Sequence, residues 1–272
     1  MVNPEIGANV NAGGIATNYH ERGSGEDLLL IHGSGPGVTA WANWRANIDA
    51  LGADFHVIAP DIVGFGYTER PKKFAYGKET WLAHLTDFLD ALGLARVSMV
   101  GNSFGGALAL AMATSAPQRV NKLVLMGSVG LDFELTDGLD QVWGYQPSLA
   151  NMEKLLKLFS FNQDLLGGDL ARLRFEASTR EGVQESYSVM FPEPRQAAIT
   201  ALATTEERIS SISHPTLVIH GRQDQVIPLS NSLRLSELIA NCELHVFDRC
   251  GHWTQIEKRE RFNTLVRDFL LA

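Results

Sequence analysis

Hydrophobic residues along the chain gather in short runs, each of which ends at a polar or glycine-rich segment. The runs span residues 28–31, 55–60, 97–100, 122–126, 216–220 and 244–247. Because consecutive positions are apolar, the runs are typical of strands buried on both faces of a parallel sheet. Helical spacing of apolar residues over about 41–51, 78–92, 107–116 and the C-terminal stretch separates most of them. The pattern predicts a mostly parallel, doubly wound α/β sheet.

One long segment interrupts this alternation. Between Gly127 and His214 there is no Val/Ile-rich run, and helical patterns occupy residues 152–159, 170–178 and 195–205 instead. We expect this segment to form a helical cap inserted into the α/β unit. The predicted organisation is a core of residues 1–130 and 212–272 and a cap, or lid, of residues 131–211.

The sequence around Ser103 indicates a nucleophile. A G-x-S-x-G pattern, formed by Gly101, Ser103 and Gly105, joins the third apolar run to a helical stretch. In this context the pattern predicts a nucleophile elbow, a sharp strand-to-helix turn that holds the serine hydroxyl above the sheet edge. The alternative is an ordinary glycine-rich turn without a chemical role.

A serine nucleophile needs a base and an acid that orients the base. In this type of fold the acid and then the histidine follow the serine along the chain. His252 lies in a loop after the last strand, and Asp224 follows the preceding strand. We predict a Ser103–His252–Asp224 triad, with Asp248 as the competing candidate for the acid.

Two backbone N–H groups are needed to bind the oxyanion that develops during such chemistry. One comes from Phe104, directly after the nucleophile, and the other from Ser34 in the glycine-rich loop 32–37. No cluster of His, Cys, Asp or Glu has the spacing of metal ligands, so the sequence implies neither a metal nor a cofactor.

Composition narrows the choice of partners. The chain has 272 residues and a formal net charge of −8, without a cluster of Lys or Arg. This disfavours nucleic acid and anionic membranes as partners. Two cysteines give no disulfide framework, and neither a signal peptide nor an apolar run long enough to span a membrane is apparent. We therefore expect a cytoplasmic protein.

Several motifs together are more specific than the triad. They are the segments 32–37, 101–106 and 250–255, and within the predicted cap 143–145 and 190–195. From about Ile6 to the C-terminus the chain resembles the meta-cleavage product hydrolases, carbon–carbon bond hydrolases of bacterial aromatic degradation with the α/β-hydrolase fold. The resemblance is greatest to the branch that acts on ring-cleavage products of phenols and alkylbenzenes.

This resemblance implies a small-molecule substrate and several binding residues. The substrate would be a 2-hydroxy-6-oxohexa-2,4-dienoate with hydrogen or a small alkyl group at C6, cleaved between C5 and C6. Arg174 would pair with the carboxylate, and Asn43, Asn102 and Trp253 would contact the polar end. Relatives of this family self-associate, which implies a homo-oligomer. The apolar end would lie between cap and sheet, with Val129, Leu131, Trp143, Phe159, Ile199, Val226 and Ile227 as candidates.

Other functions remain open at this stage. A carboxylesterase or perhydrolase would share the triad but would not need Arg174 or Asn102. Haloalkane dehalogenases and epoxide hydrolases of this fold use an aspartate where this chain has Ser103. A non-catalytic ligand-binding protein would have no use for an intact serine, acid and histidine set.

Overall fold

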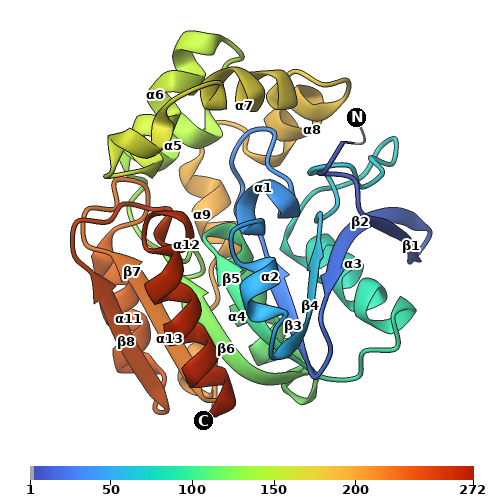
Figure 1. The fold of residues 1–272 in the computed structure, drawn as a ribbon, viewed down its shortest axis with the longest axis vertical. Coiled ribbons are helices and arrows are strands. Elements are labelled where there is room, and N and C mark those ends of the chain that lie inside the picture. Colours follow the sequence, from blue (N-terminus) through green and yellow to red (C-terminus); the bar gives the residue numbers. More distant parts are fainter. Residues whose placement is uncertain (1–2) are drawn as a thin grey trace.

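The computed structural model describes residues 3–272 and contains one eight-stranded sheet, drawn in Figure 1. Its strand order is β1-β2-β4-β3-β5-β6-β7-β8. The strands are β1 (Ala8–Ala12), β2 (Ile15–Arg22), β3 (Glu26–Ile31), β4 (Phe55–Pro60), β5 (Val97–Asn102), β6 (Val120–Met126), β7 (Thr216–Gly221) and β8 (Cys242–Phe247). β2 pairs antiparallel with both β1 and β4, whereas all other neighbours are parallel. The prediction of a mostly parallel α/β sheet is confirmed.

The central strands have both of their faces buried. In β3, Leu28 and Leu30 belong to one apolar cluster, whereas Leu29 and Ile31 belong to a cluster on the opposite face. Successive side chains of a strand point to opposite faces, so burying both faces requires an unbroken apolar run. This arrangement accounts for the runs seen in the sequence.

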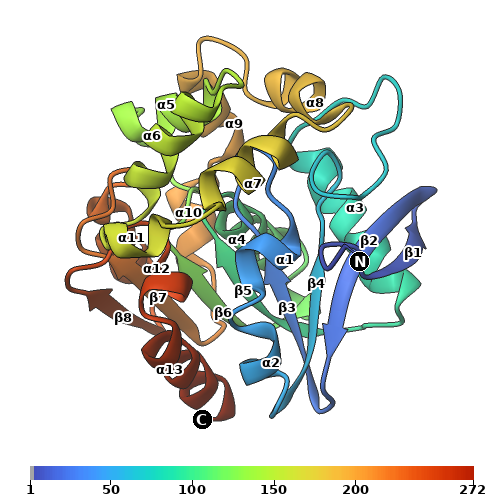
Figure 2. The same ribbon diagram turned by 45° about the horizontal axis from the view of Figure 1, so that its top comes forward.

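Helices cover both faces of the sheet, as Figures 1 and 2 show. One face carries α1 (Ala40–Trp44), α2 (Ile48–Leu51), α12 (Thr254–Glu257) and α13 (Arg259–Leu271). The other face carries α3 (Lys78–Ala91), α4 (Phe104–Ser115), α10 (Glu206–Ser210) and α11 (Leu229–Leu238), together with a 3₁₀ turn at Pro117–Arg119.

The segment between β6 and β7 is helical. It contains α5 (Asp137–Trp143), α6 (Leu149–Phe159), a 3₁₀ turn (Gln163–Leu166), α7 (Leu170–Ser178), α8 (Val183–Met190) and α9 (Gln196–Leu202), followed by α10. Helices α5 to α8 lie above the carboxyl ends of the strands in Figures 1 and 2. Their buried faces join the apolar cluster of the sheet through residues such as Leu155 and Tyr187. We call residues 131–211 the cap; its last helix, α10, packs against α4 and α11 of the core.

Two local features differ from the sequence-based expectation. The single helix expected over 41–51 is divided into α1 and α2. Between them Asn47 donates from Nδ2 to the Gln255 carbonyl and to Asn263 Oδ1, at 3.2 and 2.7 Å, which ties this turn to the C-terminal helices. The β1–β2 hairpin was not anticipated, because its residues are largely polar and β1 lies at the sheet edge.

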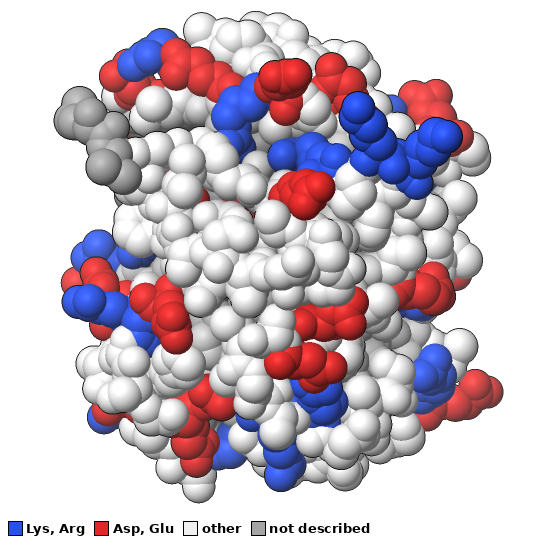
Figure 3. All heavy atoms as spheres, turned by 90° about the vertical axis from the view of Figure 1, so that its right-hand side faces the viewer, with Lys and Arg blue, Asp and Glu red and all other residues white. Residues whose placement is uncertain are grey.

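Charges are interspersed on the face shown in Figure 3. Basic and acidic side chains lie near one another there, around a broad uncharged area across the middle. Within residues 3–272, none of the helices combines the length and apolarity required to cross a membrane.

Candidate active site

Ser103 occupies a sharp turn between β5 and α4. Its backbone φ is 53°, in the left-handed region that few residues other than glycine adopt. The turn is held on both sides, since Ser103 N–H donates to the Met126 carbonyl at 2.9 Å and the Ser103 carbonyl accepts from Val129 N–H at 3.1 Å. Both partners lie in or just after β6, so the neighbouring strand stabilises the strained conformation.

The helix after Ser103 approaches β3 very closely. A Cβ atom at Gly105 would overlap the carbonyl oxygen of Ile31, and one at Gly101 would overlap the carbonyl oxygen of Gly105. Only glycine allows these approaches, so the glycines of the motif are required for packing. The geometry is that of a nucleophile elbow.

The side chains of His252 and Asp224 form a buried hydrogen-bonded pair. His252 Nδ1 lies 2.7 Å from Asp224 Oδ2, and the two side chains are 3% and 2% exposed. Because the carboxylate is an acceptor, Nδ1 carries the proton and Nε2 is left free to accept one. The competing candidate, Asp248, is 64% exposed and contacts Arg222 and Gln223 rather than His252.

Asp224 is kept ionised by the donors around it. Its Oδ1 accepts from the N–H groups of Val226 and Ile227 at 2.7 and 3.0 Å. Burial alone would raise the pKa of Asp224. The proximity of His252, with smaller contributions from His220 and the Ile227 N–H, outweighs burial and lowers the pKa below its ordinary value. An ionised Asp224 can orient His252 and stabilise its protonated form.

Ser103 and His252 line the same cavity, which has a volume of about 280 Å³. Within residues 3–272 no hydrogen bond joins the two side chains. In enzymes without substrate such contacts are often long and tighten when substrate binds. The cavity reaches from the strand ends to the cap helices, so the candidate nucleophile faces a space between core and cap.

The backbone N–H groups of Ser34 and Phe104 are available for an oxyanion. Among residues 3–272 neither group donates to another protein atom. The Phe104 side chain lies in the core against Phe65 and Trp81, at ring-centroid distances of 5.5 and 4.8 Å. Only the backbone of Phe104 can therefore act at the site.

A buried histidine fixes the orientation of the peptide that carries the Ser34 N–H. His32 Nε2 accepts from Ile62 N–H at 3.0 Å, and His32 Nδ1 lies 2.7 Å from the Gly33 carbonyl. The ring is therefore neutral with its proton on Nδ1, and burial lowers its pKa. Since the Gly33 carbonyl points at His32, the Ser34 N–H of the same trans peptide points the opposite way.

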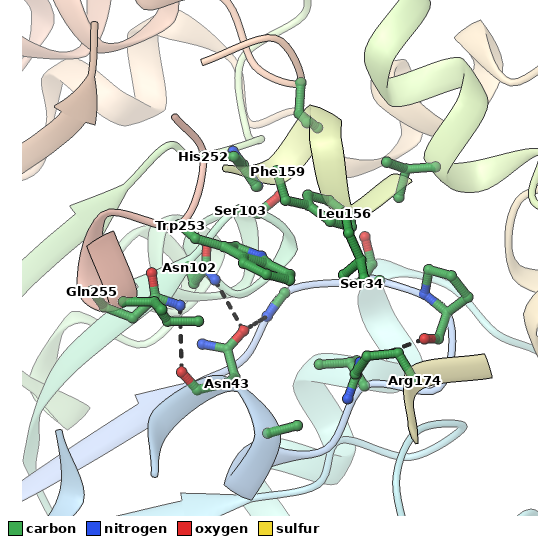
Figure 4. A pocket seen from close by; sticks show the side chains of 18 of the residues that line it. Ser34, Asn43, Asn102, Ser103, Leu156, Phe159, Arg174, His252, Trp253 and Gln255 are labelled. Atoms are coloured by element: carbon green, nitrogen blue, oxygen red, sulfur yellow. Dashed lines mark hydrogen bonds between the residues drawn. The ribbon is translucent and has the colours of Figure 1, made fainter. Parts of the chain in front are cut away.

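Two asparagines and one glutamine form a polar wall of the cavity, shown with their hydrogen bonds in Figure 4. Asn43 Oδ1 accepts from Gly33 N–H at 3.3 Å and from Asn102 Nδ2 at 3.0 Å, which fixes both amide orientations. Asn102 Oδ1 and Asn43 Nδ2 are buried without a partner among the described residues. Gln255, which donates to the Asn43 carbonyl at 3.3 Å, was not predicted, although it lies in the quoted segment 250–255.

Arg174 reaches the cavity from α7 of the cap. Its Nη2 lies 3.4 Å from the Pro36 carbonyl, and Nη1 is buried without a partner among residues 3–272. Burial lowers the pKa of Arg174 to about 10, opposed by Glu5 and reinforced by Arg45 and Arg180. Arg45, which sequence reasoning missed, also lines the cavity, and no Asp or Glu does so in the described structure. The cavity is therefore suited to an anion.

The apolar part of the cavity differs from the sequence-based expectation. Of the seven candidates, Phe159 and Val226 line it, together with Leu139, Val142, Met152, Leu156, Leu165 and Leu170. Trp143 and Ile199, which were predicted as substrate contacts, do not line it, and Val129, Leu131 and Ile227 are also absent from its walls. Trp143 instead stacks on Phe191 at 4.5 Å and donates from Nε1 to Ser34 Oγ at 2.9 Å.

Trp253 connects the histidine loop to the cap. Its backbone N–H donates to the Phe159 carbonyl at 3.1 Å, and the Trp253 and Phe159 rings stack with centroids 5.0 Å apart. The centroid of the Phe159 ring also lies 6.0 Å from that of the His252 ring. Figure 4 shows Phe159, Trp253 and His252 together at the cavity. The C-terminal end of α6 is thus attached to the loop that carries the candidate base.

Comparisons with known proteins agree with this geometry. Residues 27–259 match the family model of the alpha/beta hydrolase fold. The chain is 58% identical to a 2-hydroxy-6-oxo-2,4-heptadienoate hydrolase of Pseudomonas putida, covering 100% of this chain and 98% of the relative. It is 54% identical to a 2-hydroxymuconate semialdehyde hydrolase of a Pseudomonas species, covering 98% and 94%.

A solved structure is similar throughout. It is a serine-to-alanine mutant of a meta-cleavage product hydrolase from Pseudomonas fluorescens, complexed with acetates. The TM-score is 0.98, the sequence identity is 54%, and the similarity covers 98% of each chain.

Proposed function

This chain belongs to the meta-cleavage product hydrolases of the α/β-hydrolase family, and from that membership we propose its reaction. The substrate is a 2-hydroxy-6-oxohexa-2,4-dienoate with hydrogen or a small alkyl group at C6. Hydrolysis of its C5–C6 bond gives 2-hydroxypenta-2,4-dienoate and a carboxylic acid. The role is a step in the bacterial degradation of aromatic compounds.

The observation that carries the proposal is one cavity with two chemically different ends. Ser103 and His252 line one part of it, and Arg174, whose Nη1 has no partner among the described residues, reaches into another part that no Asp or Glu lines. A dienoate has a carbonyl at C6 and a carboxylate at C1, so it can engage both parts. A simple ester would leave the buried Nη1 of Arg174 without a partner, which is unfavourable.

The polar wall supports the same orientation. Asn102 Oδ1 and Asn43 Nδ2 lack protein partners, and they are an acceptor and a donor respectively. The C2 hydroxyl group of a dienoate can donate to the first and accept from the second. This pairing would hold the enol end of the substrate beside Arg174, with C6 against Ser103.

The reaction requires two stages. In the first, the C2 hydroxyl loses its proton and C5 gains one, which converts the dienol into a ketone, and His252 is positioned for this transfer. In the second, the oxygen of Ser103, or of a water it holds, attacks C6. The C6 oxyanion then accepts from the N–H groups of Ser34 and Phe104.

Breaking the C5–C6 bond completes the balance of atoms. Its electron pair is delocalised through C4 and C3 to the C2 ketone oxygen, which regenerates the dienol after protonation. One water supplies the hydroxyl of the carboxylic acid and the remaining proton. Acyl–Ser103 and gem-diol intermediates both satisfy this balance.

The cavity volume supports a small C6 group. About 280 Å³ lies just below the range of roughly 300–1,000 Å³ usual for ligand pockets. The apolar side chains around it, including Leu139 and Val226, come from both cap and core. Hydrogen or methyl at C6 fits this space better than phenyl.

The test is stopped-flow absorbance with 2-hydroxy-6-oxohepta-2,4-dienoate, whose yellow colour is lost on cleavage. We expect rapid bleaching by the parent protein and a loss of roughly a thousandfold or more in kcat for Ser103→Ala. Ser98→Ala, in the same strand but away from the cavity lining, is the control and should retain activity.

The competing activity has its own readout. If the parent turns over p-nitrophenyl acetate but leaves the dienoate unchanged, the substrate assignment is wrong and the protein is a serine esterase. If a serine-directed reagent fails to label Ser103 and neither substrate reacts, the nucleophile assignment is wrong as well.

We also propose that the protein acts in the cytoplasm as a homo-oligomer. The free thiols of Cys242 and Cys250 support a reducing compartment. Exposed apolar side chains on the cap, among them Leu173 at 54% and Val189 at 63%, support self-association. Light scattering after size-exclusion chromatography tests the oligomer, and a monomeric mass at micromolar concentration contradicts it.

A further inference from the structure

A second histidine lies behind the candidate triad. His220, at the end of β7, is fully buried and does not line the substrate cavity. Its Nε2 lies 3.1 Å from the Ile227 carbonyl and 3.5 Å from Asp224 Oδ2, and its Nδ1 lies 2.7 Å from Ser232 Oγ. The oxygen Oδ2 of Asp224 is therefore located between two imidazole rings.

The hydrogen bonds of His220 fix its tautomer. The Ile227 carbonyl can only accept, so Nε2 carries a proton and points toward both Ile227 and Asp224. Burial, together with the proximity of His252, lowers the pKa of His220, although Asp224 opposes the shift. In the neutral ring Nδ1 is then an acceptor, and the buried Ser232 hydroxyl supplies its proton.

From this geometry we propose that His220 is a positioning residue, which holds Asp224 and its turn through a neutral imidazole locked by Ser232. The turn 224–227 carries both Asp224 and the Ile227 carbonyl, and His220 attaches it to β7 and α11. The same N–H group partly neutralises the Asp224 carboxylate. The inference rests on the proposed role of Asp224 and adds to it.

The position of His220 affects the equilibrium between neutral and protonated His252. Asp224 stabilises a positive charge on His252, and the His220 N–H dipole, 3.5 Å from the carboxylate, weakens that stabilisation. The titratable groups that face Asp224 are His252 and His220, with Cys250 nearby; burial raises the pKa of the Cys250 thiol to about 12, so it stays neutral. Loss of the His220 N–H should therefore favour protonated His252.

The experiment compares His220→Leu with His220→Gln in the full chain. Glutamine can keep an N–H at the position of Nε2, whereas leucine removes it at similar volume. For leucine we expect kcat to fall roughly tenfold, while KM changes less than about twofold because His220 does not touch the cavity. In the profile of kcat/KM against pH, the midpoint of the acid limb should rise by roughly half a pH unit to one pH unit. Glutamine should restore most of both values.

Two further variants separate positioning from a general loss of stability. His84→Leu removes another buried neutral histidine, on α3, and should lower stability without moving the acid limb. Ser232→Ala should move the acid limb in the same direction as His220→Leu, but by less. If the leucine variant fails to fold, the result with Ser232→Ala tests the proposal. The proposal is overturned if the acid limb stays in place in both His220→Leu and Ser232→Ala. If His220→Leu cannot be purified, an unchanged acid limb in Ser232→Ala alone overturns it.

The profiles are recorded with both the dienoate and p-nitrophenyl acetate. A parent that cleaves only the ester contradicts the proposed reaction but still tests His220. For a parent that cleaves neither, NMR titration of the His252 ring reports the same equilibrium without turnover. A titration midpoint that is identical in the parent and the variants then overturns the proposal.

Discussion

Arg174 places a positive charge at a cavity that no Asp or Glu lines in the described structure. Its Nη1 is buried and unpaired among the described residues, and the charged groups that act on it are one acid, Glu5, and two bases, Arg45 and Arg180. A buried charge without a partner is costly, so such a residue is retained where a ligand supplies the missing charge. Guanidinium can bind a carboxylate through two parallel hydrogen bonds, which an ammonium group cannot do.

We therefore expect Arg174→Lys to impair the dienoate reaction selectively. Loss of one charge-assisted hydrogen bond costs about 1.5–3 kcal/mol, which corresponds to roughly 10- to 150-fold in kcat/KM. The loss should appear mainly in KM and should be absent with p-nitrophenyl acetate, which has no carboxylate. Steady-state kinetics with both substrates measures this difference.

Arg172→Gln is the matched control for Arg174, two positions away on α7. Arg172 is half exposed and pairs with Asp169 and Glu176 on the surface of the helix. Its replacement should leave both reactions unchanged. Equal losses on the ester and the dienoate for Arg174→Lys would show that the residue supports the fold of the cap rather than the carboxylate.

Residue by residue, the sequence was most informative where chemistry depends on the order of motifs. Ser103, Asp224 and His252 could be chosen because each follows an apolar run, and the structure brings Asp224 and His252 into contact. Trp143 and Ile199 could not be placed in this way, because an apolar side chain in the cap fits either the core or a cavity wall. Gln255 and Arg45 were missed because hydrogen bonding and exposure at a cavity have no sequence pattern.

At the scale of elements, the elbow shows how one helix and three strands determine one backbone turn. Helix α4 begins directly after Ser103 and lies against β3, while β6 holds the turn by hydrogen bonds. Gly105 is where α4 and β3 come closest. In a helix, glycine costs about 0.5–1 kcal/mol relative to alanine, so close packing must outweigh helix propensity at this position.

Gly105→Ala should accordingly destabilise the protein. The added Cβ would overlap the Ile31 carbonyl, and shifting α4 away from β3 costs about 1–3 kcal/mol, which exceeds the gain in helix propensity. The shift would also move Phe104 N–H, so kcat should fall together with the free energy of unfolding. Urea denaturation and dienoate kinetics measure the two effects.

Gly167→Ala is the control for this change. Gly167 has a φ of −72°, and no atom lies closer than 3.8 Å to an added Cβ, so alanine fits without strain. An increase in stability for Gly105→Ala would show that α4 can move away from β3 at little cost, contrary to the packing argument.

Elements with a strong hydrophobic period were predicted well, and elements without one were not. Helix α6 buries Met152, Leu155, Leu156 and Phe159, the positions that indicated it. The β1–β2 hairpin is stabilised by pairing with β4 rather than by an apolar pattern. The break between α1 and α2 depends on Asn47, whose partners lie more than 200 positions away. Long-range contacts of this kind cannot be inferred from local sequence.

At the scale of the whole molecule, the site is assembled from loops after β3, β5, β7 and β8, together with the cap. Parallel strands bring their carboxyl ends to one edge, so the positions of the candidate triad follow from the topology. The cap encloses this edge, and its α7 supplies Arg174. The sequence predicts which segments meet, whereas the volume and lining of the cavity depend on how the cap helices pack.

Several histidines are buried in a neutral state, and this affects the stability of the whole molecule. His84 Nδ1 accepts from Val63 N–H at 3.4 Å, and Nε2 lies 2.9 Å from Thr17 Oγ1. Burial lowers the pKa of His84 from 6.5 to about 4. The pKa values of His32 and His220 are lowered in the same direction, also mainly by burial.

These shifts determine the sign of the pH dependence. Between about pH 4 and pH 6.5 the unfolded chain binds a proton at His84 that the folded protein does not, so stability rises with pH in this window. The contribution is complete above pH 6.5 and is lost as the pH falls toward 4, with an upper limit of about 3 kcal/mol for His84.

Urea unfolding of the parent and of His84→Leu at several pH values between 4.5 and 7.5 tests this pH dependence. The variant should be less stable at pH 7.5 and lose less stability on acidification, because leucine does not titrate. Parallel curves for the two proteins would mean that His84 binds its proton equally well in the folded and unfolded states.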